Sequence, residues 1–304
     1  MSECRFHPVL LGIFAALPMM VLATPALAGG GSVDRKVNAS ANGEVVISNV
    51  SGTVDVRGWD RNEVQVTGHL DDDVERLDVD TSGGRTVIKV IVPRGGGSHD
   101  SSATLEVQVP RMSTVEVSAV SADVSSRGVL GTQRLKSVSG EVTADVSGSD
   151  SEIRTVSGDL TVRGSGKPIS LRVSSVSGSL DLSNGAGKLD VVTVSGDARV
   201  QMIEASEIRG RTTSGNLDLR TRLTREARVE LEAVSGDLTI RLPGTEGLST
   251  DIESFSGDIH GCLAQNVERV SKYGPGVRLN IRTVESGSYV RAKTLSGDID
   301  VCNK

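Results

Sequence analysis

Aromatic residues are nearly absent from this chain of 304 residues, in which one Trp, two Tyr and three Phe make up 2% of the sequence. The interior therefore has to be built from Val, Leu, Ile and Ala, which suit regularly stacked β layers. Apolar residues at helical spacing are lacking after residue 30, whereas the two-residue alternation of strands recurs, as at Val54 and Val56. With 37% hydrophobic and 24% charged residues, the sequence predicts a globular, all-β chain.

Long apolar runs are lacking too, apart from one at the N-terminus. Residues 9–27 form an apolar segment that Pro18 interrupts and that leads into Ala26-Leu27-Ala28, a small-x-small cleavage signal. A membrane anchor is the alternative, but a span needs about 20 uninterrupted apolar residues. We therefore expect a signal peptide, a mature chain without a membrane span, and a periplasmic or cell-surface location. No cysteine stands directly after this segment to carry a lipid anchor.

What the sequence does contain is one six-residue word in eight copies. TVSGDL at residues 155–160 returns in related forms, whose glycines are Gly140, Gly158, Gly178, Gly196, Gly215, Gly236, Gly257 and Gly297. Successive glycines lie 18, 20, 18, 19, 21 and 21 residues apart, and the last step of 40 is a double one. Steps of about 20 residues are typical of solenoids, in which each coil buries its apolar face by stacking. We predict a single-stranded β-helix, since a sandwich has no reason to repeat.

Each word is predicted to form a corner between two short strands. Glycine adopts positive φ without strain, and the Asp, Asn or Ser after it hydrogen-bonds nearby backbone. The change Gly196→Val is accordingly expected to cost roughly 1 kcal/mol or more. Two columns before the corner keep their size, one small as at Thr155 and the next apolar as at Val156. Such columns indicate coils stacked in register, about 4.8 Å apart.

The word recurs upstream in blurred form, as Val50-Ser51-Gly52 and Val120-Ser121-Ala122. Strand patterns and turn-rich loops lie between these two copies. An uncovered first coil would expose strand edges that invite aggregation, so we interpret this region as a cap. The expected organisation is a signal peptide over residues 1–28, an N-terminal β-strand cap region over residues 29–118, and a β-solenoid repeat domain over residues 119–304.

Three features carry a resemblance to a known family. They are VDVRGWDRNEV at residues 54–64, LEVQVP at residues 105–110, and the repeated Val-Ser-Gly-Asp words. Together they resemble the bacterial putative-adhesin family of β-strand-repeat envelope proteins, a domain of unknown function, over nearly all of the mature chain. The resemblance implies an exported β-solenoid with a surface or envelope role, and it brings no catalytic residue with it.

Side chains that could carry chemistry recur in every coil instead of converging. The column after the corner reads Glu141, Asp159, Ser179, Asp197, Asn216, Asp237, Asp258 and Asp298. This column could form a cation-binding ladder or an acidic docking face. Alternatively, each residue closes its own turn, and the uncharged members Ser179 and Asn216 favour this second interpretation. The glycine-rich word of calcium-binding β-rolls is absent. His69 precedes a solvated acidic loop, and His99 and His260 show no metal-ligand pattern, so we predict no metal, no cofactor and no catalytic residue.

Two classes of function remain. The favoured one is a non-catalytic exported envelope protein, an adhesin-like structural or binding scaffold for an envelope or surface polymer or protein, with an accessory role in envelope-stress signalling as a variant. The alternative is a polysaccharide-acting enzyme, because β-helices carry many such enzymes. Those sites combine a carboxylate pair with aromatic or Arg platforms, and the repeat region has only Phe255, Tyr273 and Tyr289 as aromatics. The net charge of −6 argues against nucleic acid as a partner.

Only two cysteines, Cys262 and Cys302, survive removal of the signal peptide. An exported chain with an even number of cysteines favours a disulfide. Each lies five residues after a corner glycine, but two coils apart, with Val277 to Ile281 expected to supply the coil between. Two steps of about 4.8 Å exceed the ~7 Å that a disulfide tolerates between Cα atoms. We still predict this disulfide, because Gly261 and the nearby chain end let the two residues leave the ladder.

Overall fold

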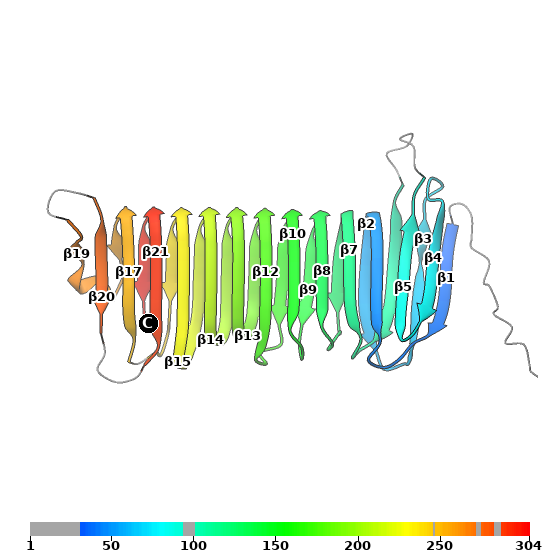
Figure 1. The fold of residues 1–304 in the computed structure, drawn as a ribbon, viewed down its shortest axis with the longest axis horizontal. Helices are drawn as coiled ribbons and strands as arrows, with labels where there is room; N and C mark the ends of the chain where they lie inside the picture. Colours follow the sequence, from blue (N-terminus) through cyan, green and yellow to red (C-terminus); the bar gives the residue numbers. More distant parts are fainter. Residues whose placement is uncertain (1–30, 94–100, 246, 272–274, 283–286) are drawn as a thin grey trace, which may run out of the picture.

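The computed structural model describes residues 31–93, 101–245, 247–271, 275–282 and 287–304, so the expected signal peptide and His99 lie outside the described residues. Strands and one short 3-10 helix make up the fold, which confirms the prediction of an all-β chain (Figure 1). The elements are β1 (Gly31–Asn38), β2 (Glu44–Trp59), β3 (Glu63–Leu70), β4 (Arg76–Ser82), β5 (Arg85–Ile91), β6 (Ala103–Pro110), β7 (Thr114–Arg127), β8 (Gln133–Ser139), β9 (Val142–Val146), β10 (Ser151–Ser157), β11 (Leu160–Gly164), β12 (Ile169–Ser177), β13 (Leu180–Ser195), β14 (Ala198–Ser214), β15 (Leu217–Ser235), β16 (Leu238–Arg241), β17 (Ser249–Ser256), β18 (Ile259–His260), η1 (Ala264–Asn266), β19 (Glu268–Arg269), β20 (Val277–Ile281), β21 (Tyr289–Ser296) and β22 (Ile299–Cys302).

The strands of the repeat region pair in parallel with the strands of the coils before and after them. Thr155 in β10 lies opposite Ser137 in β8 and Ser175 in β12, so equivalent positions of successive words stand side by side. The coils consequently stack corner over corner along the long axis of the molecule (Figure 1). Each coil is named below by its corner glycine.

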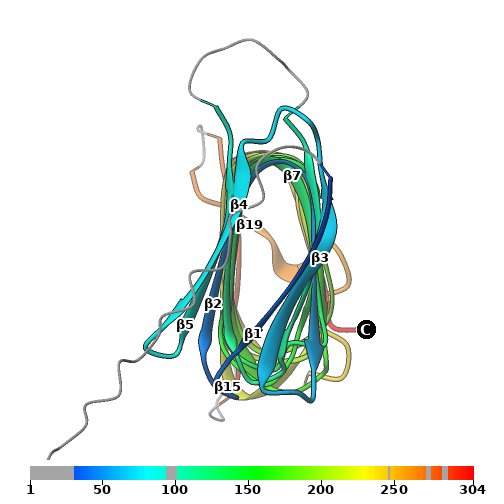
Figure 2. The same ribbon diagram turned by 90° about the vertical axis from the view of Figure 1, so that its right-hand side faces the viewer.

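Each coil contributes a strand to two faces. Strands that lead into the corner, such as β8, β10 and β12, form what is termed the front face, and strands that leave it, such as β9, β11 and β16, form the back face. Viewed along the stack, the coils superpose as a narrow oval (Figure 2). Ile153 on the front and Leu160 and Val162 on the back point inward and are at most 1% exposed. Because side chains alternate across a strand, the two-residue pattern places one apolar layer from each face in the core.

The N-terminal region contains the first coil of the stack as well as its cover. β2 pairs in parallel with β7, and Gly52 lies opposite Ala122 even though the two are far apart in sequence. β5 and β6 cover the outer edge of β2, and β4, β3 and β1 continue outward with antiparallel pairing. The division expected between residues 118 and 119 falls inside β7.

The last coil of the chain lies between two coils that precede it in sequence. β21 pairs in parallel with β15 on one side and with β17 on the other, and its label stands between theirs in Figure 1. β22 likewise lies between β16 and β18. The corners therefore stack in the order Gly236, Gly297, Gly257. The expectation that Val277 to Ile281 separate the last two corners is wrong, because β20 pairs antiparallel with the outer edge of β17.

Candidate functional site

The corner glycines set the spacing of everything else on the stack. All eight have positive φ, between +129° and +152°. At Gly196, a Cβ atom would also approach the backbone of Gly178 in the neighbouring coil to well under 3.0 Å. The position therefore requires glycine for its torsion angle and for the close approach of two backbones. These residues shape the edge and supply no chemistry of their own.

The column after the corner links neighbouring coils. Asp159 Oδ1 accepts the backbone N–H of Ser179 in the next coil at 2.8 Å. The same contact joins Asp123 to Glu141, Asp197 to Asn216, Asn216 to Asp237, Asp237 to Asp298, and Asp298 to Asp258. The interpretation that each residue closes its own turn is therefore wrong for these members. In-register stacking brings the next coil's N–H within reach of the carboxylate or amide oxygen, which satisfies a backbone donor at the corner.

Cys262 and Cys302 form a disulfide with a Cα–Cα distance of 4.9 Å. The distance fits because the Gly257 and Gly297 coils are direct neighbours, as the pairing of β18 with β22 shows. Cys302 is the last residue of β22, whereas Cys262 lies in the turn after β18, beyond Gly261. The bond ties the inserted coil to the coil outside it.

The inserted coil adds Asp298 to the neighbours of His260, besides Asp258 two residues before it in the sequence. Ligand atoms of Asp258, His260 and Asp298 lie within 4.8 Å of one another, on exposed side chains. These three are the residues that could hold a cation, and no comparable group includes His69 in the described part of the chain. One oxygen of Asp298 already accepts the N–H of Asp258, so its carboxylate has a structural role. The missed signal is that Asp258 and Asp298 each lie one residue after a corner glycine, with His260 two residues beyond Asp258 on the same strand face.

Arg241 and Asp300 form an ion pair beside this group, with 2.7 Å between Arg241 Nη2 and Asp300 Oδ2. The hydrogen bond from Arg241 lowers the pKa of Asp300, and the same contact raises the pKa of the guanidinium. Asp300 therefore stays ionised at neutral pH and is unsuited to act as a general acid.

The apolar column before the corner is exposed. Its members, each 42–52% exposed, are Val120, Val138, Val156, Val176, Val194, Val234, Leu295 and Phe255. This set is termed the apolar stripe, and Thr213 interrupts it in the Gly215 coil. The small column one residue earlier, which includes Thr155 and Thr193, points into the core instead. The stripe thus runs along the corner end of the front face without contributing to the core of this chain.

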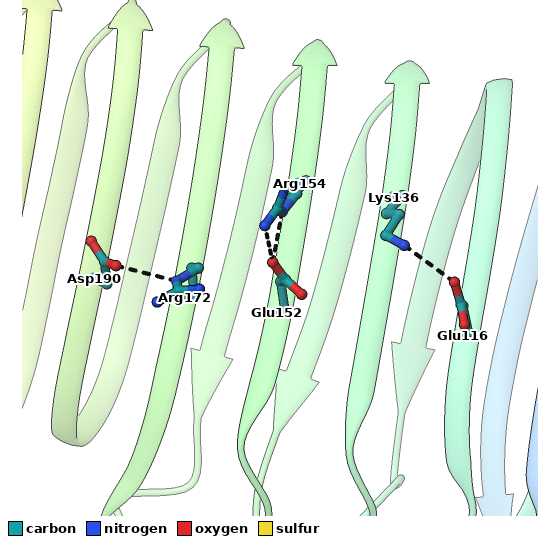
Figure 3. Close-up of polar contacts among 6 residues, drawn as sticks. All are labelled: Glu116, Lys136, Glu152, Arg154, Arg172 and Asp190. Carbon is teal, nitrogen blue, oxygen red and sulfur yellow. Dashed lines mark hydrogen bonds and ion pairs between the residues drawn. The ribbon is translucent and has the colours of Figure 1, made fainter.

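The rest of the front face carries charges of both signs. Lys136 Nζ lies 3.2 Å from Glu116 Oε1, and Arg172 Nε lies 3.2 Å from Asp190 Oδ2, so each pair joins two coils (Figure 3). Arg154 donates to Glu152 within its own strand at 2.7 Å, as Figure 3 also shows. Exposed pairs of this kind contribute about 1 kcal/mol or less each to stability. Their effect here is a surface of alternating sign.

A shallow groove forms where the stripe meets these charges over the last coils. Its lining includes Val194, Thr213, Val234, Phe255 and Leu295 from the corner end, and Arg211, Glu232, Glu253 and Lys293 below them. Thr213 is the smallest side chain of the row, whereas Phe255 is the largest. Phe255 therefore projects at one end of the groove, and Thr213 lies next to Val194, which lines the other end.

Parallel coils stacked in register define a β-rich repeat scaffold. The chain belongs to the Toastrack DUF4097 family, whose model matches residues 36–302. This match confirms the resemblance to a putative-adhesin domain of unknown function.

Several solved structures are similar to this chain. A "putative adhesin" from Parabacteroides distasonis is 12% identical, with 90% of this chain and 98% of that chain covered and a TM-score of 0.48. A "putative adhesin" from Bacteroides fragilis is 9% identical, with 89% and 97% covered and a TM-score of 0.39. A "putative lipid binding protein" from Parabacteroides distasonis is 12% identical, with 90% and 98% covered and a TM-score of 0.39. No curated protein matches the chain. Among the described residues, no helix has the length and apolarity to cross a bilayer.

Proposed function

We propose that this protein is a non-catalytic, exported envelope protein that works as an adhesin-like binding scaffold. In this proposal residues 1–28 are a signal peptide, and the coil stack is a single-stranded β-solenoid that presents its outward columns to a partner at the cell surface or in the periplasm. The observation that carries the proposal is the apolar stripe.

The stripe consists of eight half-exposed apolar side chains in successive coils, interrupted only at Thr213. At about 4.8 Å per coil, it is roughly 40 Å long. Contiguous apolar patches of this extent on a protein surface usually mark interaction sites. The core needs none of these side chains, so their exposure supports a role in contact with another molecule.

The distribution of acidic groups supports binding rather than catalysis. Carboxylates of the corner column accept backbone N–H groups of the next coil, and those of the front face pair with Arg or Lys. A glycosidase needs two carboxylates that flank one bond of the substrate, one of them with a raised pKa. Among the described carboxylates, Asp300 has a clearly shifted pKa, and that pKa is lowered rather than raised. The disulfide in turn supports an oxidising compartment.

A binding assay with cell envelopes of the producing bacterium tests the proposal. The mature chain is labelled and compared with a variant that carries Val138→Ser, Val156→Ser and Val176→Ser. Each change removes a half-exposed valine worth about 1 kcal/mol when buried, so we expect binding to weaken at least about tenfold. A matched control carries Thr143→Ser, Thr161→Ser and Thr239→Ser on the back face and should bind like the wild type.

Two results would contradict the proposal. Equal binding by the stripe variant and the control would show that the stripe is not the contact surface. Depolymerisation of envelope polysaccharide by the purified chain would show that the protein is an enzyme. N-terminal sequencing of the exported protein checks the location separately, with Gly29 expected as the first residue.

A further inference from the structure

One column of the front face alternates in charge from coil to coil between the coil of β7 and the coil of β17. The residues six positions before the corners are, in stacking order, Glu116, Arg134, Glu152, Arg172, Asp190, Arg209, Glu230, Arg291 and Asp251. In sequence order Glu230 and Asp251 would be neighbours, and the inserted coil places Arg291 between them. The alternation is therefore a property of the folded stack.

A second column, two residues nearer the corner, alternates over the last coils. Its order is Arg211, Glu232, Lys293 and Glu253, and adjacent members lie opposite one another in paired strands. This column forms the lower wall of the groove beneath the stripe. The groove thus combines apolar residues at its upper edge with a row of charges of changing sign.

This pattern restricts the partner. A polymer of uniform charge would meet a like charge at every second coil, and like charges in contact are strongly unfavourable. A carbohydrate would need aromatic platforms, whereas the stripe offers aliphatic side chains and one Phe. A row of alternating charges is complementary to itself when it is turned end for end about a point between two coils. A second copy of this chain supplies such a row.

We infer that two copies of this chain bind face to face through the groove, with antiparallel stacks and a two-fold axis between the Gly236 and Gly297 coils. Every charged position of the groove then faces the opposite sign in the other copy. Arg211 faces Glu253, Glu232 faces Lys293, and in the longer column Arg209 faces Asp251 and Glu230 faces Arg291. Such an interface is isologous, as in most two-fold dimers.

The apolar residues agree with the same axis. Phe255, 52% exposed, faces the smaller Thr213 of the other copy, and Leu295 faces Val234. Large and small side chains therefore meet at both ends of the groove. The inference rests on the proposed function, since it names a second copy as one partner of the front face, and it leaves Val138 and Val156 outside the contact.

The contact is small. Four to five coils at about 4.8 Å and four outward side chains per strand cover roughly 20 by 20 Å, the low end of specific interfaces. We expect a reversible dimer with a dissociation constant in the micromolar range. On a cell surface, where many copies are held together, weak contacts of this kind add up through multivalency.

Sedimentation velocity of the mature chain over rising concentration tests the inference. The wild type should shift from monomer to dimer, and added salt should weaken the dimer because charged contacts contribute to it. Phe255→Ser should weaken dimerisation at least about tenfold, as expected for an aromatic anchor. Val138→Ser, on the same stripe and 48% exposed, should leave dimerisation unchanged because it lies outside the contact. A wild type that stays monomeric at all concentrations overturns the inference, as does an equal effect of the two variants.

A charge exchange provides a second test that does not depend on removing a side chain. Glu232→Lys places Lys opposite Lys293 in a homodimer, and Lys293→Glu places Glu opposite Glu232, so each variant alone should be monomeric. Mixed in equal amounts, the two variants should form a heterodimer, because each new charge then meets its opposite. Circular dichroism confirms that both are folded. A mixture that remains monomeric refutes the proposed axis.

The two proposals fail separately. Envelope binding with a monomeric wild type would leave the proposed function standing and remove the second copy as a partner. A wild type that dimerises but does not bind envelopes would contradict the proposed function and leave the dimer standing.

Discussion

The corner glycines allow a sharp test of the coil spacing through the change Gly196→Ala. At φ +138°, an alanine pays a torsional penalty of about 1–2 kcal/mol. Its Cβ would also overlap the backbone of Gly178. Relief of that overlap separates two coils and stretches the 2.9 Å hydrogen bond from Leu180 N to Asp197 O, which costs about 1–3 kcal/mol. We expect a loss of about 3 kcal/mol in the free energy of unfolding, more than the torsional penalty alone would cause.

Gly83→Ala is the matched control. Gly83 lies in the turn between β4 and β5 at φ +58°, and no atom lies within 4 Å of the position that an alanine Cβ would take there. Gly83→Ala should lower the free energy of unfolding only by the torsional penalty, about 1 kcal/mol. Urea unfolding followed by circular dichroism measures both variants. The reasoning is refuted if Gly196→Ala is no less stable than Gly83→Ala, since close approach of the coils would then carry no energetic weight.

Three further outcomes follow from the contacts between coils. Replacing Cys262 and Cys302 together by Ala opens a loop with a sequence separation of 40, and the loop-closure model gives a loss of about 4 kcal/mol, to be measured as a lower urea midpoint. An unchanged urea midpoint would show that the disulfide does not stabilise the last coils. Asp237→Ala removes the oxygen that accepts the N–H of Asp298 at 2.8 Å and should lower the free energy of unfolding by about 1 kcal/mol. Asp237→Asn keeps an acceptor oxygen and should retain that stability. Equal losses in the two variants would contradict the link between the coils. Because Arg241 lowers the folded-state pKa of Asp300, this pair stabilises the protein above the ordinary pKa of Asp, and the stability is lost as pH falls through the lowered value. Asp300→Asn should flatten that part of the acid-unfolding curve, and an unaltered curve would disprove the coupling.

The candidate surface could be predicted from sequence only in part. The column that includes Val156 is recognisable as a ladder, and the inward alternation of Ile153 and Thr155 implies that it faces outward, but this consequence was not drawn. The small column at Thr155 is inside because it continues the alternation that buries Ile153 two residues earlier. The alternating charges were missed as well. Aligning the coils by their corners would have revealed them, with Arg291 as the residue that separates Glu230 from Asp251.

The sequence by itself determined the all-β class, the repeated corner and the inward alternation. These features depend on interactions within a few residues, namely the torsion of glycine and the pleat of a strand. The tertiary structure decided the stacking order of the last coils, the direction in which Asp237 and Asp298 bridge, and the short distance between the cysteines. Those contacts join residues 40 and 61 positions apart, where the chain can close its loops in more than one order. Like charges would face each other if the Gly257 coil lay on the Gly236 coil, so the inserted coil with its Arg and Lys is the arrangement that pairs them.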